Sequence, residues 1–352
     1  MASAQSQEDQ VLEEETSFVR ILTLNRPRQL NALSAQMRYE TDSNVKLLIL
    51  KGKGRAFCAG GDVAAVVRGI NEVGMQLVLK VSILNGIVMG GGAGVSIHGR
   101  FRVATENSVF AMPETALGLF PDIGASYFLS RLPGFFGEYV GLTGARLDGA
   151  EMRACGLATH FVPSSRLALL EEALYKVNSS DPAVISAVID KFSLEPYLKD
   201  HSAYHWMDVI DKCFSRRTVE EILSALESES TNRADAWISD AIQSLKKASP
   251  TSLKISLRSI REGRLQGVGQ CLIREYRMVC HVMMGEVSKD FFEGCRAILL
   301  DKDKNPKWKP SKLELVNDNM VDQYFSKIND DRWEDIKLPA RSNLPATAIA
   351  KL

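Results

Sequence analysis

The chain has 352 residues, of which 45% are hydrophobic, so it is long enough to bury a full core as one large domain or two smaller ones. Lysine plus arginine equals aspartate plus glutamate at 43 each, and this balance excludes an overall field that would draw the protein to nucleic acid or to an anionic membrane. No apolar run approaches the roughly 20 residues of a spanning helix, so we expect a soluble globular protein with no membrane partner.

Cysteine and histidine are the residue types that would indicate a metal site or a disulfide framework. The six cysteines are scattered without a C-x-x-C pair: Cys58, Cys155, Cys213, Cys271, Cys280 and Cys295. Such scatter is typical of packing residues in a reduced intracellular compartment. His201 and His205 approach ligand spacing, but no third ligand candidate stands near them. We expect neither a metal nor a cofactor.

The N-terminal part of the chain predicts a tail followed by strands. Residues 1–16 are polar and acidic, and we expect them to be disordered. Phe18 to Asn25 is typical of a strand, and Val45 to Lys51, with four consecutive leucine or isoleucine residues, is typical of a fully buried strand of an α/β fold. Gly60-Gly61 then forms a turn, and the run VAAVV after Asp62 indicates the start of a helix.

Glycine is concentrated between Val81 and Arg131. Val81 to Leu84 predicts a short buried strand, and the run from Gly90 to Gly94 then brings backbone close to something that side chains would exclude. Exposed N–H groups at such a turn, with a helix dipole behind them, favour a phosphate or a developing oxyanion. Close backbone packing is the alternative interpretation. The run has no lysine and continues with Val95, so it matches neither the Walker loop nor the dinucleotide pattern.

Two carboxylates follow this turn in apolar surroundings. Glu114 lies among Phe, Met, Pro and Ala residues, and Asp122 follows eight residues later in a Phe-Pro-Asp-Ile-Gly sequence. Pro121 argues against one continuous helix through both. Apolar surroundings can separate the pKa values of two acids and so assign acid and base roles. Taken singly, either residue could instead be a loop or capping carboxylate, and Asp122 precedes a predicted helix as an N-cap would.

The rest of the chain is predicted to be mainly helical. Phe135 to Leu142 and Asp148 to Cys155 predict helices closed by glycines, and a strand at Thr159 to Val162 is expected to end the sheet. Thr218 to Glu221 is a capping box, and Ser249-Pro250 starts a helix that ends at Gly263. A later apolar stripe is predicted to be core: Leu272, Tyr276, Val279 and Met283.

The predicted organisation has four parts. They are a disordered N-terminal tail at 1–16, an α/β core with the active site at 17–170, a helical C-terminal region at 171–338 and a C-terminal tail at 339–352. The boundary near 170 rests on the change from buried-strand patterns to helix caps.

Four motifs together are similar to those of a known family. They are the segment from Arg55 to Asp62 (RAFCAGGD), the run MGGGAG, the Pro113-Glu114 pair and the Phe120-Pro121-Asp122 turn. From about Val19 to Trp308 the chain resembles the crotonase (enoyl-CoA hydratase/isomerase) superfamily, and most closely its 3-hydroxyisobutyryl-CoA hydrolases of the plant peroxisomal type. This resemblance implies an α/β, crotonase-like fold of repeated ββα units with a helical C-terminal region.

The resemblance also implies a site and a reaction. It assigns the backbone N–H groups of Gly61 and Gly91 to the oxyanion that forms when a thioester is attacked. Glu114 matches the catalytic glutamate, which attacks the carbonyl or activates water, and Asp122 matches its partner, which binds the substrate hydroxyl or assists proton transfer. The implied reaction is hydrolysis of the acyl-CoA substrate 3-hydroxyisobutyryl-CoA in valine catabolism. CoA is part of that substrate and is not a cofactor.

Two other functions remain open at this point. A hydratase needs a second glutamate, and the corresponding position here is Gly94. A crotonase-fold binding protein without catalysis is favoured by length, because the chain is shorter than its relatives between Met37 and Asp42 and between Asn71 and Val81. In relatives the second stretch supplies another substrate-binding glutamate, and no residue here can be assigned to it.

The C-terminus carries a tripeptide that resembles a targeting signal. Ala350-Lys351-Leu352 is similar to the S-K-L peroxisomal address, so we expect a peroxisomal protein that binds the peroxisomal import receptor. Relatives often form trimers or hexamers through their C-terminal helices, and the resemblance allows a homo-oligomer here without specifying its size.

Overall fold

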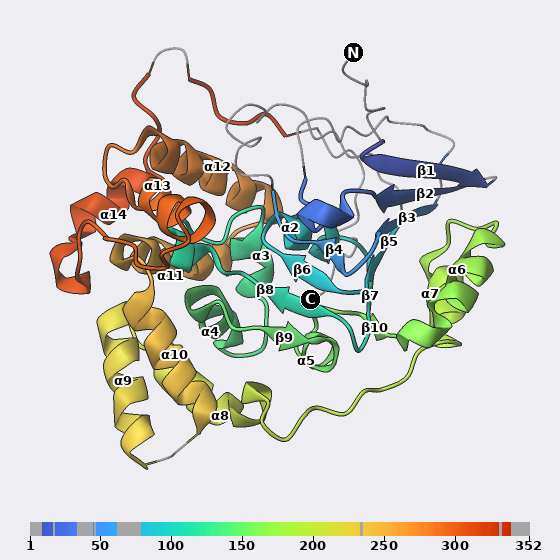
Figure 1. The fold of residues 1–352 in the computed structure, drawn as a ribbon, viewed down its shortest axis with the longest axis horizontal. Coiled ribbons are helices and arrows are strands. Elements are labelled where there is room, and N and C mark those ends of the chain that lie inside the picture. Colours follow the sequence, from blue (N-terminus) through green and yellow to red (C-terminus); the bar gives the residue numbers. More distant parts are fainter. Residues whose placement is uncertain are drawn as a thin grey trace, which may run out of the picture. The chain divides into compact units, whose positions relative to one another are not determined.

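The computed structural model describes residues 9–16, 18–33, 45, 47–61, 79–232, 235–330 and 333–338 (Figure 1). These residues form two compact units. The first unit contains the chain up to Phe110 together with Leu147–Tyr197, and the second contains Ala111–Arg146 together with the chain from Leu198 to Ala340. Within the described ranges, every helix is too short or too polar to cross a membrane.

The first unit is built on a six-stranded sheet. Its strands lie in the order β1 (Val11–Thr16), β2 (Val19–Leu24), β3 (Leu47–Gly52), β5 (Leu79–Leu84), β7 (Phe101–Ala104) and β10 (His160–Phe161). β1 is antiparallel to β2, and all other neighbours are parallel. Apolar residues are in register across the sheet, because Ile49 pairs with Ile21 on one side and with Val81 on the other.

Two helices cover one face of this sheet. They are α6 (Leu167–Tyr175) and α7 (Pro182–Asp190), and their apolar residues join those of the strands in one buried cluster (Figure 1). Leu170 on α6 and Ile189 on α7 are fully buried there. Each such side chain contributes roughly 1.5–3 kcal/mol when it leaves water. The cluster therefore holds the six-stranded sheet and the two helices together.

A second sheet of four short strands belongs mainly to the same unit. Its order is β4 (Ala56–Cys58), β6 (Ile87–Met89), β8 (Val109–Ala111) and β9 (Leu147–Asp148). Two short helices follow its strands, α2 (Gly91–Ile97) after β6 and α5 (Gly149–Ala154) after β9. Gly60-Gly61 follows shortly after β4, and Gly91 follows shortly after β6. Two strands of this sheet therefore position both glycine turns.

The second unit is helical. Its elements are a 3-10 turn η2 (Glu114–Leu117) and the helices α3 (Ala125–Leu129), α4 (Phe136–Thr143), α8 (Met207–Phe214), α9 (Val219–Asn232), α10 (Ala236–Lys247), α11 (Pro250–Gly263), α12 (Val268–Met284), α13 (Asp290–Cys295) and α14 (Asp318–Phe325). Phe120, Phe128 and Phe136 are fully buried in this unit. The core of the helical unit therefore surrounds the segment that carries both predicted catalytic acids.

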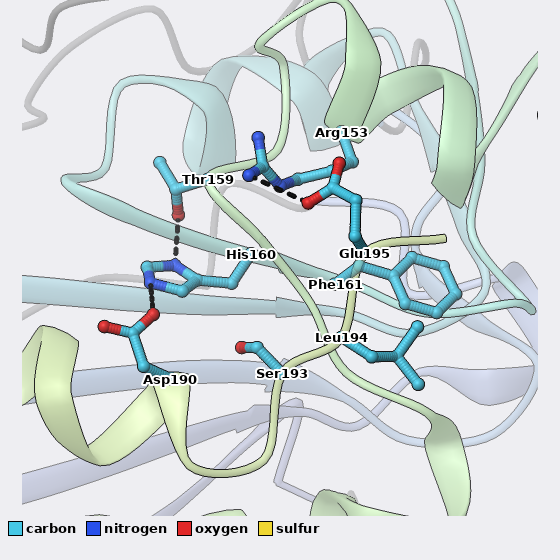
Figure 2. A pocket seen from close by; sticks show the side chains of 8 residues that line it. All are labelled: Arg153, Thr159, His160, Phe161, Asp190, Ser193, Leu194 and Glu195. Atoms are coloured by element: carbon cyan, nitrogen blue, oxygen red, sulfur yellow. Dashed lines mark hydrogen bonds and ion pairs between the residues drawn. The ribbon is translucent and has the colours of Figure 1, made fainter. Parts of the chain in front are cut away.

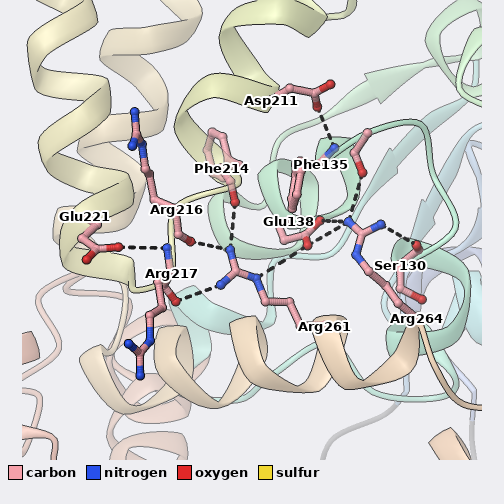
Figure 3. A network of polar contacts seen from close by, with 11 residues as sticks. Ser130, Phe135, Glu138, Asp211, Phe214, Arg216, Arg217, Glu221, Arg261 and Arg264 are labelled. Carbon is pink, nitrogen blue, oxygen red and sulfur yellow. Dashed lines mark hydrogen bonds and ion pairs between the residues drawn. The ribbon is translucent and has the colours of Figure 1, made fainter.

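Two arginines at the C-terminal end of α11 tie the helices together (Figure 3). Arg261 donates hydrogen bonds to the backbone carbonyls of the 214–217 turn, which joins α8 to α9. Arg264 donates to both carboxylate oxygens of Glu138 at 2.8 and 2.9 Å, and Glu138 on α4 is fully buried. Because a buried carboxylate is stable only when it is paired, this network fixes α4 against α11.

Most of the elements predicted from the sequence are present. The buried strand expected at 45–51 is β3, and the helix expected at 135–142 is α4, which ends at Gly144 in the left-handed conformation. The predicted capping box at Thr218 and Glu221 forms, with the hydroxyl and the carboxylate each accepting a backbone N–H. Every strand of the described chain lies before residue 162. The helix expected after Asp62 falls outside the described residues.

Two expectations about organisation are wrong. Residues 11–16 form β1 instead of a disordered tail, because their backbone pairs with β2 and the exposed Glu13 and Glu15 bind Arg20. Residues 1–8 and 339–352 lie outside the described part. The boundary near 170 also differs, because α6 and α7 pack on the sheet while residues 111–146 pack with the helices. Each unit is made of more than one stretch of the sequence, so no single boundary in the sequence divides the chain into the two units.

The predicted core face of α12 is also wrong. Leu272, Tyr276, Val279 and Met283 are only half-buried, and the buried face instead carries Cys271, Glu275, Met278 and Val282. The C-terminal segment 333–338 covers part of the half-buried face, where Trp333 stacks on Tyr276 and Asp335 pairs with Arg277 at 2.5 Å. The segment thus accounts for the apolar Tyr276 of the stripe, and the opposite face of α12 meets the core.

Candidate active site

The two glycines predicted to stabilise an oxyanion lie against each other in the first unit. A Cβ atom added to Gly91 would lie 2.9 Å from the Gly61 nitrogen and 3.1 Å from the Gly60 carbonyl carbon. Gly60 has φ +121° and its carbonyl accepts a hydrogen bond from Leu33 N–H at 2.9 Å, which fixes the turn. Among the described residues, neither the Gly61 N–H nor the Gly91 N–H has a hydrogen-bond acceptor. Within this part of the chain, both amides are thus donors without an acceptor, and they lie in adjacent backbone.

Close backbone packing, the alternative interpretation of the glycine run, also applies here. A Cβ atom on Gly92 would lie 2.1 Å from the Cys58 carbonyl oxygen, so α2 meets β4 with no room for a side chain. The two interpretations do not compete, because this packing is what brings Gly91 beside Gly61.

Two buried cations hold the C-terminal end of α2. Lys80 on β5 donates from Nζ to the Val95 carbonyl, and Arg102 on β7 donates to the Gly99 carbonyl at 2.8 Å. Burial lowers the pKa of Lys80 to about 8 and that of Arg102 to about 10. Cations at a helix C-terminus stabilise the helix through its dipole. They therefore help to fix α2, whose first residue is Gly91.

Glu114 is a buried acid without a full set of partners. Its side chain is 5% exposed, and its Oε2 has no hydrogen-bond partner among the described residues. Burial raises the pKa of Glu114 well above its ordinary value, and the nearby Asp122 charge raises it further. A buried carboxyl group with a raised pKa and an unpartnered oxygen is a candidate general base or nucleophile.

The turn η2 that carries Glu114 is fixed by close contacts with α13. A Cβ atom on Gly118, which has φ +74°, would lie 2.3 Å from the Asp290 carbonyl oxygen. A Cβ atom on Gly294 would lie 2.2 Å from the Leu117 carbonyl oxygen. These contacts leave η2 little freedom to shift, so the position of Glu114 depends on the backbone of α13.

Asp122 stands on a strained turn at the start of α3. Its side chain is half-buried, and its backbone carbonyl accepts the Ala125 N–H at 3.0 Å. The next two residues both have positive φ, +59° at Ile123 and +79° at Gly124. A β-branched residue in this conformation is uncommon and strained. Burial, followed by the charge of Glu275, raises the pKa of Asp122 to about 7.

Glu275 on α12, which no sequence motif singles out, contacts the turn that follows Asp122. Its carboxylate accepts the backbone N–H of Gly124 at 2.5 Å and that of Ser126 at 2.9 Å, on either side of the first residue of α3. A signal does exist in the spacing, because Cys271, Met278 and Val282 form a buried stripe that Glu275 interrupts. A carboxylate within such a stripe indicates a specific partner.

A polar hollow of about 190 Å³ in the first unit does not contain any of the four predicted site residues (Figure 2). Its lining residues are Arg153, Thr159, His160, Phe161, Asp190, Ser193, Leu194 and Glu195. His160 Nε2 lies 3.2 Å from Asp190, and Arg153 lies 3.2 Å from Glu195. These two pairs include all four charged residues of the lining, so the hollow is explained as a structural contact between β10, α5 and the segment after α7.

The structure therefore brings the predicted site residues together in two pairs. Gly61 and Gly91 meet in the first unit, and Glu114 and Asp122 interact electrostatically in the second. Among the described residues, no group of three or more histidine, cysteine or acidic side chains is placed to hold a metal ion. The chemistry available is that of backbone donors and two carboxyl groups with raised pKa values.

Comparison with known proteins defines the class. The sequence profile of the enoyl-CoA hydratase/isomerase family matches residues 19–80 and 77–325. The chain therefore belongs to this family. A carnitinyl-CoA dehydratase from Mycobacterium thermoresistibile has a similar structure, with a TM-score of 0.80 and 32% identity over 92% of this chain and 98% of that one. The predicted crotonase-like α/β fold is thus confirmed.

Two relatives are more similar in sequence. The chain is 67% identical over 380 aligned positions to 3-hydroxyisobutyryl-CoA hydrolase 1 of Arabidopsis thaliana, with 100% of both chains covered. It is 65% identical to the probable 3-hydroxyisobutyryl-CoA hydrolase 2 of the same species, over 97% of this chain and 98% of the relative. The predicted resemblance to these hydrolases is confirmed.

The same comparisons bear on the shortened stretches. The first alignment spans 380 positions but this chain has 352 residues, so at least 28 positions of that relative have no counterpart here. The family profile matches in two segments that meet at 77–80, within the stretch from Asn71 to Val81 that was expected to be short. Residues 37–42 and most of 71–81 lie outside the described residues.

Proposed function

We propose that the chain hydrolyses the thioester of 3-hydroxyisobutyryl-CoA to 3-hydroxyisobutyrate and CoA. The observation that carries this proposal is the 67% identity, over the full length of both chains, to a relative with that name. The acid pair supports it, because burial raises the pKa of both Glu114 and Asp122, and Asp122 with a pKa of about 7 can exchange protons near neutral pH.

In the proposed mechanism Glu114 acts on the thioester carbonyl, either as a general base for water or as the nucleophile. Attack on the carbonyl carbon places a negative charge on the carbonyl oxygen, and the N–H groups of Gly61 and Gly91 stabilise that charge. The carbon–sulfur bond then breaks and CoA leaves as a thiolate, which takes up a proton. Both routes consume one water and release one acid and one thiol, and they use the same residues.

Asp122 is the proposed second acid. With a pKa of about 7, it is present in both protonation states at neutral pH, so it can donate a proton to the leaving thiolate or accept one. It can also hydrogen-bond the substrate hydroxyl. No metal or redox cofactor takes part in this proposal, and the CoA group belongs to the substrate.

A non-catalytic role is the second candidate, and one observation favours it. At least 28 positions of the first relative have no counterpart in this chain. The sequence comparison predicts short stretches between Met37 and Asp42 and between Asn71 and Val81, and the second of these is expected to supply part of the acyl pocket wall in relatives. Hydration is the weaker alternative, because Gly94 stands where a hydratase needs its second glutamate. Loss of pocket wall would admit water and weaken the oxyanion donors, so we expect slower turnover than in full-length relatives.

A substrate comparison tests the proposal. The purified chain is given 3-hydroxyisobutyryl-CoA, 3-hydroxypropionyl-CoA and crotonyl-CoA, and both thiol release and loss of the enoyl group are followed. We expect thiol release from the two hydroxyacyl substrates and the highest rate with the first. Preferential hydration of crotonyl-CoA would assign the chain to the hydratases, and binding of acyl-CoA without any turnover would favour the non-catalytic role.

We also propose that the reaction is a step of valine catabolism in the peroxisome. The identity to a 3-hydroxyisobutyryl-CoA hydrolase supports the step in valine catabolism. The tripeptide Ala350-Lys351-Leu352 supports the compartment, because it would bind the peroxisomal import receptor wherever it ends the natural chain. A fluorescent fusion with a free C-terminus should enter peroxisomes, and the same fusion without the tripeptide should not. A cytosolic signal in both would contradict the proposal. Light scattering of the purified protein would show whether it is a homo-oligomer.

A further inference from the structure

Glu275 is a buried carboxylate with a complete set of hydrogen-bond donors. It is 2% exposed, and its carboxylate accepts three hydrogen bonds. They come from Gly124 N–H at 2.5 Å, Ser126 N–H at 2.9 Å and the Ser126 hydroxyl at 2.5 Å. Because a buried charge is costly, such a residue is stable only where donors converge on it. All three donors belong to the turn and first residues of α3.

These donors lie beside the strained residues that follow Asp122. Ile123 and Gly124 have φ values of +59° and +79°, and a strained turn of this kind persists only if its surroundings determine it. Glu275 binds the backbone of Gly124 within that turn and the backbone of Ser126 just after it. The carboxylate therefore stabilises the backbone conformation on which the position of Asp122 depends.

Arg274 supports this arrangement through Ser126 and α11. Its guanidinium donates to the Ser126 hydroxyl at 2.8 Å and to the Ser259 carbonyl at 2.8 Å. The Ser126 hydroxyl thus accepts from Arg274 and donates to Glu275. A hydrophobic residue in place of Glu275 would leave the buried Gly124 and Ser126 N–H groups without this acceptor, which would destabilise the turn. The carboxylate therefore serves the turn that follows Asp122.

We propose that Glu275 is a positioning residue of the active site, which holds the Asp122 turn in its strained conformation and keeps a negative charge beside the Asp122 carboxyl group. This inference rests on the proposed thioester hydrolysis, in which Asp122 takes part. Glu275 contacts no reacting atom in this mechanism and acts through Asp122.

The electrostatic part of this role has a definite sign. After burial, the Glu275 charge is the next cause that raises the pKa of Asp122. Glu114 interacts with Asp122 from η2, while Arg274 and Cys271 on α12 interact with Glu275, and Arg131 after α3 interacts with Cys271. These groups stay in place when Glu275 becomes neutral, so that change alone lowers the pKa of Asp122.

The test is the pH dependence of kcat/KM for CoA release from 3-hydroxyisobutyryl-CoA in Glu275→Gln. Glutamine keeps the shape but can accept at only one of its two polar atoms, so the turn loosens and kcat/KM should fall roughly 10- to 100-fold. The limb of the profile that belongs to Asp122 should move to lower pH by on the order of one unit. This direction is the same whether Asp122 acts as acid or as base. Asp122→Asn identifies that limb by removing it.

Glu229→Gln is the matched control. Glu229 is also buried, on α9, and pairs with Lys212 without contact to the Asp122 turn. This variant should keep the wild-type pH profile even if its stability falls. A lower kcat/KM in Glu275→Gln with an unchanged profile would show a purely structural role and overturn the inference.

Two further outcomes are decisive. Where Glu275→Gln does not fold, Ser126→Ala carries the test, because it removes one hydrogen bond to Glu275 and keeps the charge. It should lower kcat/KM several-fold without moving the pH profile, and wild-type activity in this variant would overturn the inference.

If the wild-type chain itself releases no CoA, the proposed function fails and the inference falls with it. Wild-type activity together with an unaffected Glu275→Gln refutes the inference alone.

Discussion

Replacement of Asp122 by asparagine should make the protein more stable at alkaline pH while it lowers activity. The folded protein raises the pKa of Asp122 from its ordinary value of 3.8 to about 7, so the folded state binds this proton more tightly than the unfolded state. Stability linked to this group is therefore present below the unfolded pKa and is lost as the pH rises towards 7. Asparagine cannot ionise and avoids the loss.

The expected magnitude follows from the difference between the two pKa values. A difference of about three pH units corresponds to roughly 4 kcal/mol as an upper bound. Since the Asp122 side chain is only half-buried, solvent screening reduces the expected effect to about 2 kcal/mol. At pH 8 the asparagine variant should thus exceed the wild type in free energy of unfolding by about this amount, and near pH 4 the two should be equal.

Urea unfolding at several pH values between 4 and 8 measures this difference. Tryptophan fluorescence is a suitable signal, because the chain contains four tryptophans. The asparagine variant should show a shallower decrease in stability with pH than the wild type, and CoA release should fall in the same preparation. Parallel stability curves for the two proteins would refute the reasoning, since they would show that folding leaves the pKa of Asp122 unchanged.

Three further predictions concern the framework of the site. Gly91→Ala should lower kcat by at least 10-fold with the fold retained, because its Cβ would lie 2.9 Å from the Gly61 nitrogen and separate the two donors; circular dichroism is the control. Gly294→Ala should destabilise the protein by about 1–3 kcal/mol and shift η2, because its Cβ would lie 2.2 Å from the Leu117 carbonyl oxygen; thermal unfolding measures this. Glu138→Gln should cost about 1.5–3 kcal/mol, because it breaks the ion pair between the buried Glu138 carboxylate and the partly exposed Arg264, and a Tm equal to wild type would contradict this.

The parts of the fold that could be predicted from the sequence are those whose signals are local. The consecutive apolar residues of β3 have to be buried on both faces, and the capping residues at Thr218 and Glu221 satisfy N–H groups within one turn. Gly144 ends α4 because its left-handed conformation favours glycine. Both glycine turns and both acids of the site were likewise marked by short motifs, although local motifs do not by themselves place them in space.

The features that sequence reasoning missed depend on distant contacts. β1 has an acidic, exposed sequence like that of a tail, and it becomes a strand because β2 offers a free edge and Arg20 binds its glutamates. The apolar stripe of α12 was assigned to the core, but Trp333 covers it from a segment far along the chain. Glu275 was missed for the same reason, since its partners on α3 lie about 150 residues earlier.

The most direct test of the account is the rate of CoA release by Glu114→Gln. Glutamine keeps the size of the side chain but can neither attack the thioester nor accept a proton from water. We expect the rate on 3-hydroxyisobutyryl-CoA to fall by roughly 10²- to 10⁴-fold, while urea unfolding shows a stable fold. Because the buried acid is removed, stability at pH 8 should be equal to or above that of the wild type. Wild-type turnover in this variant would contradict the central claim that Glu114 carries the hydrolysis.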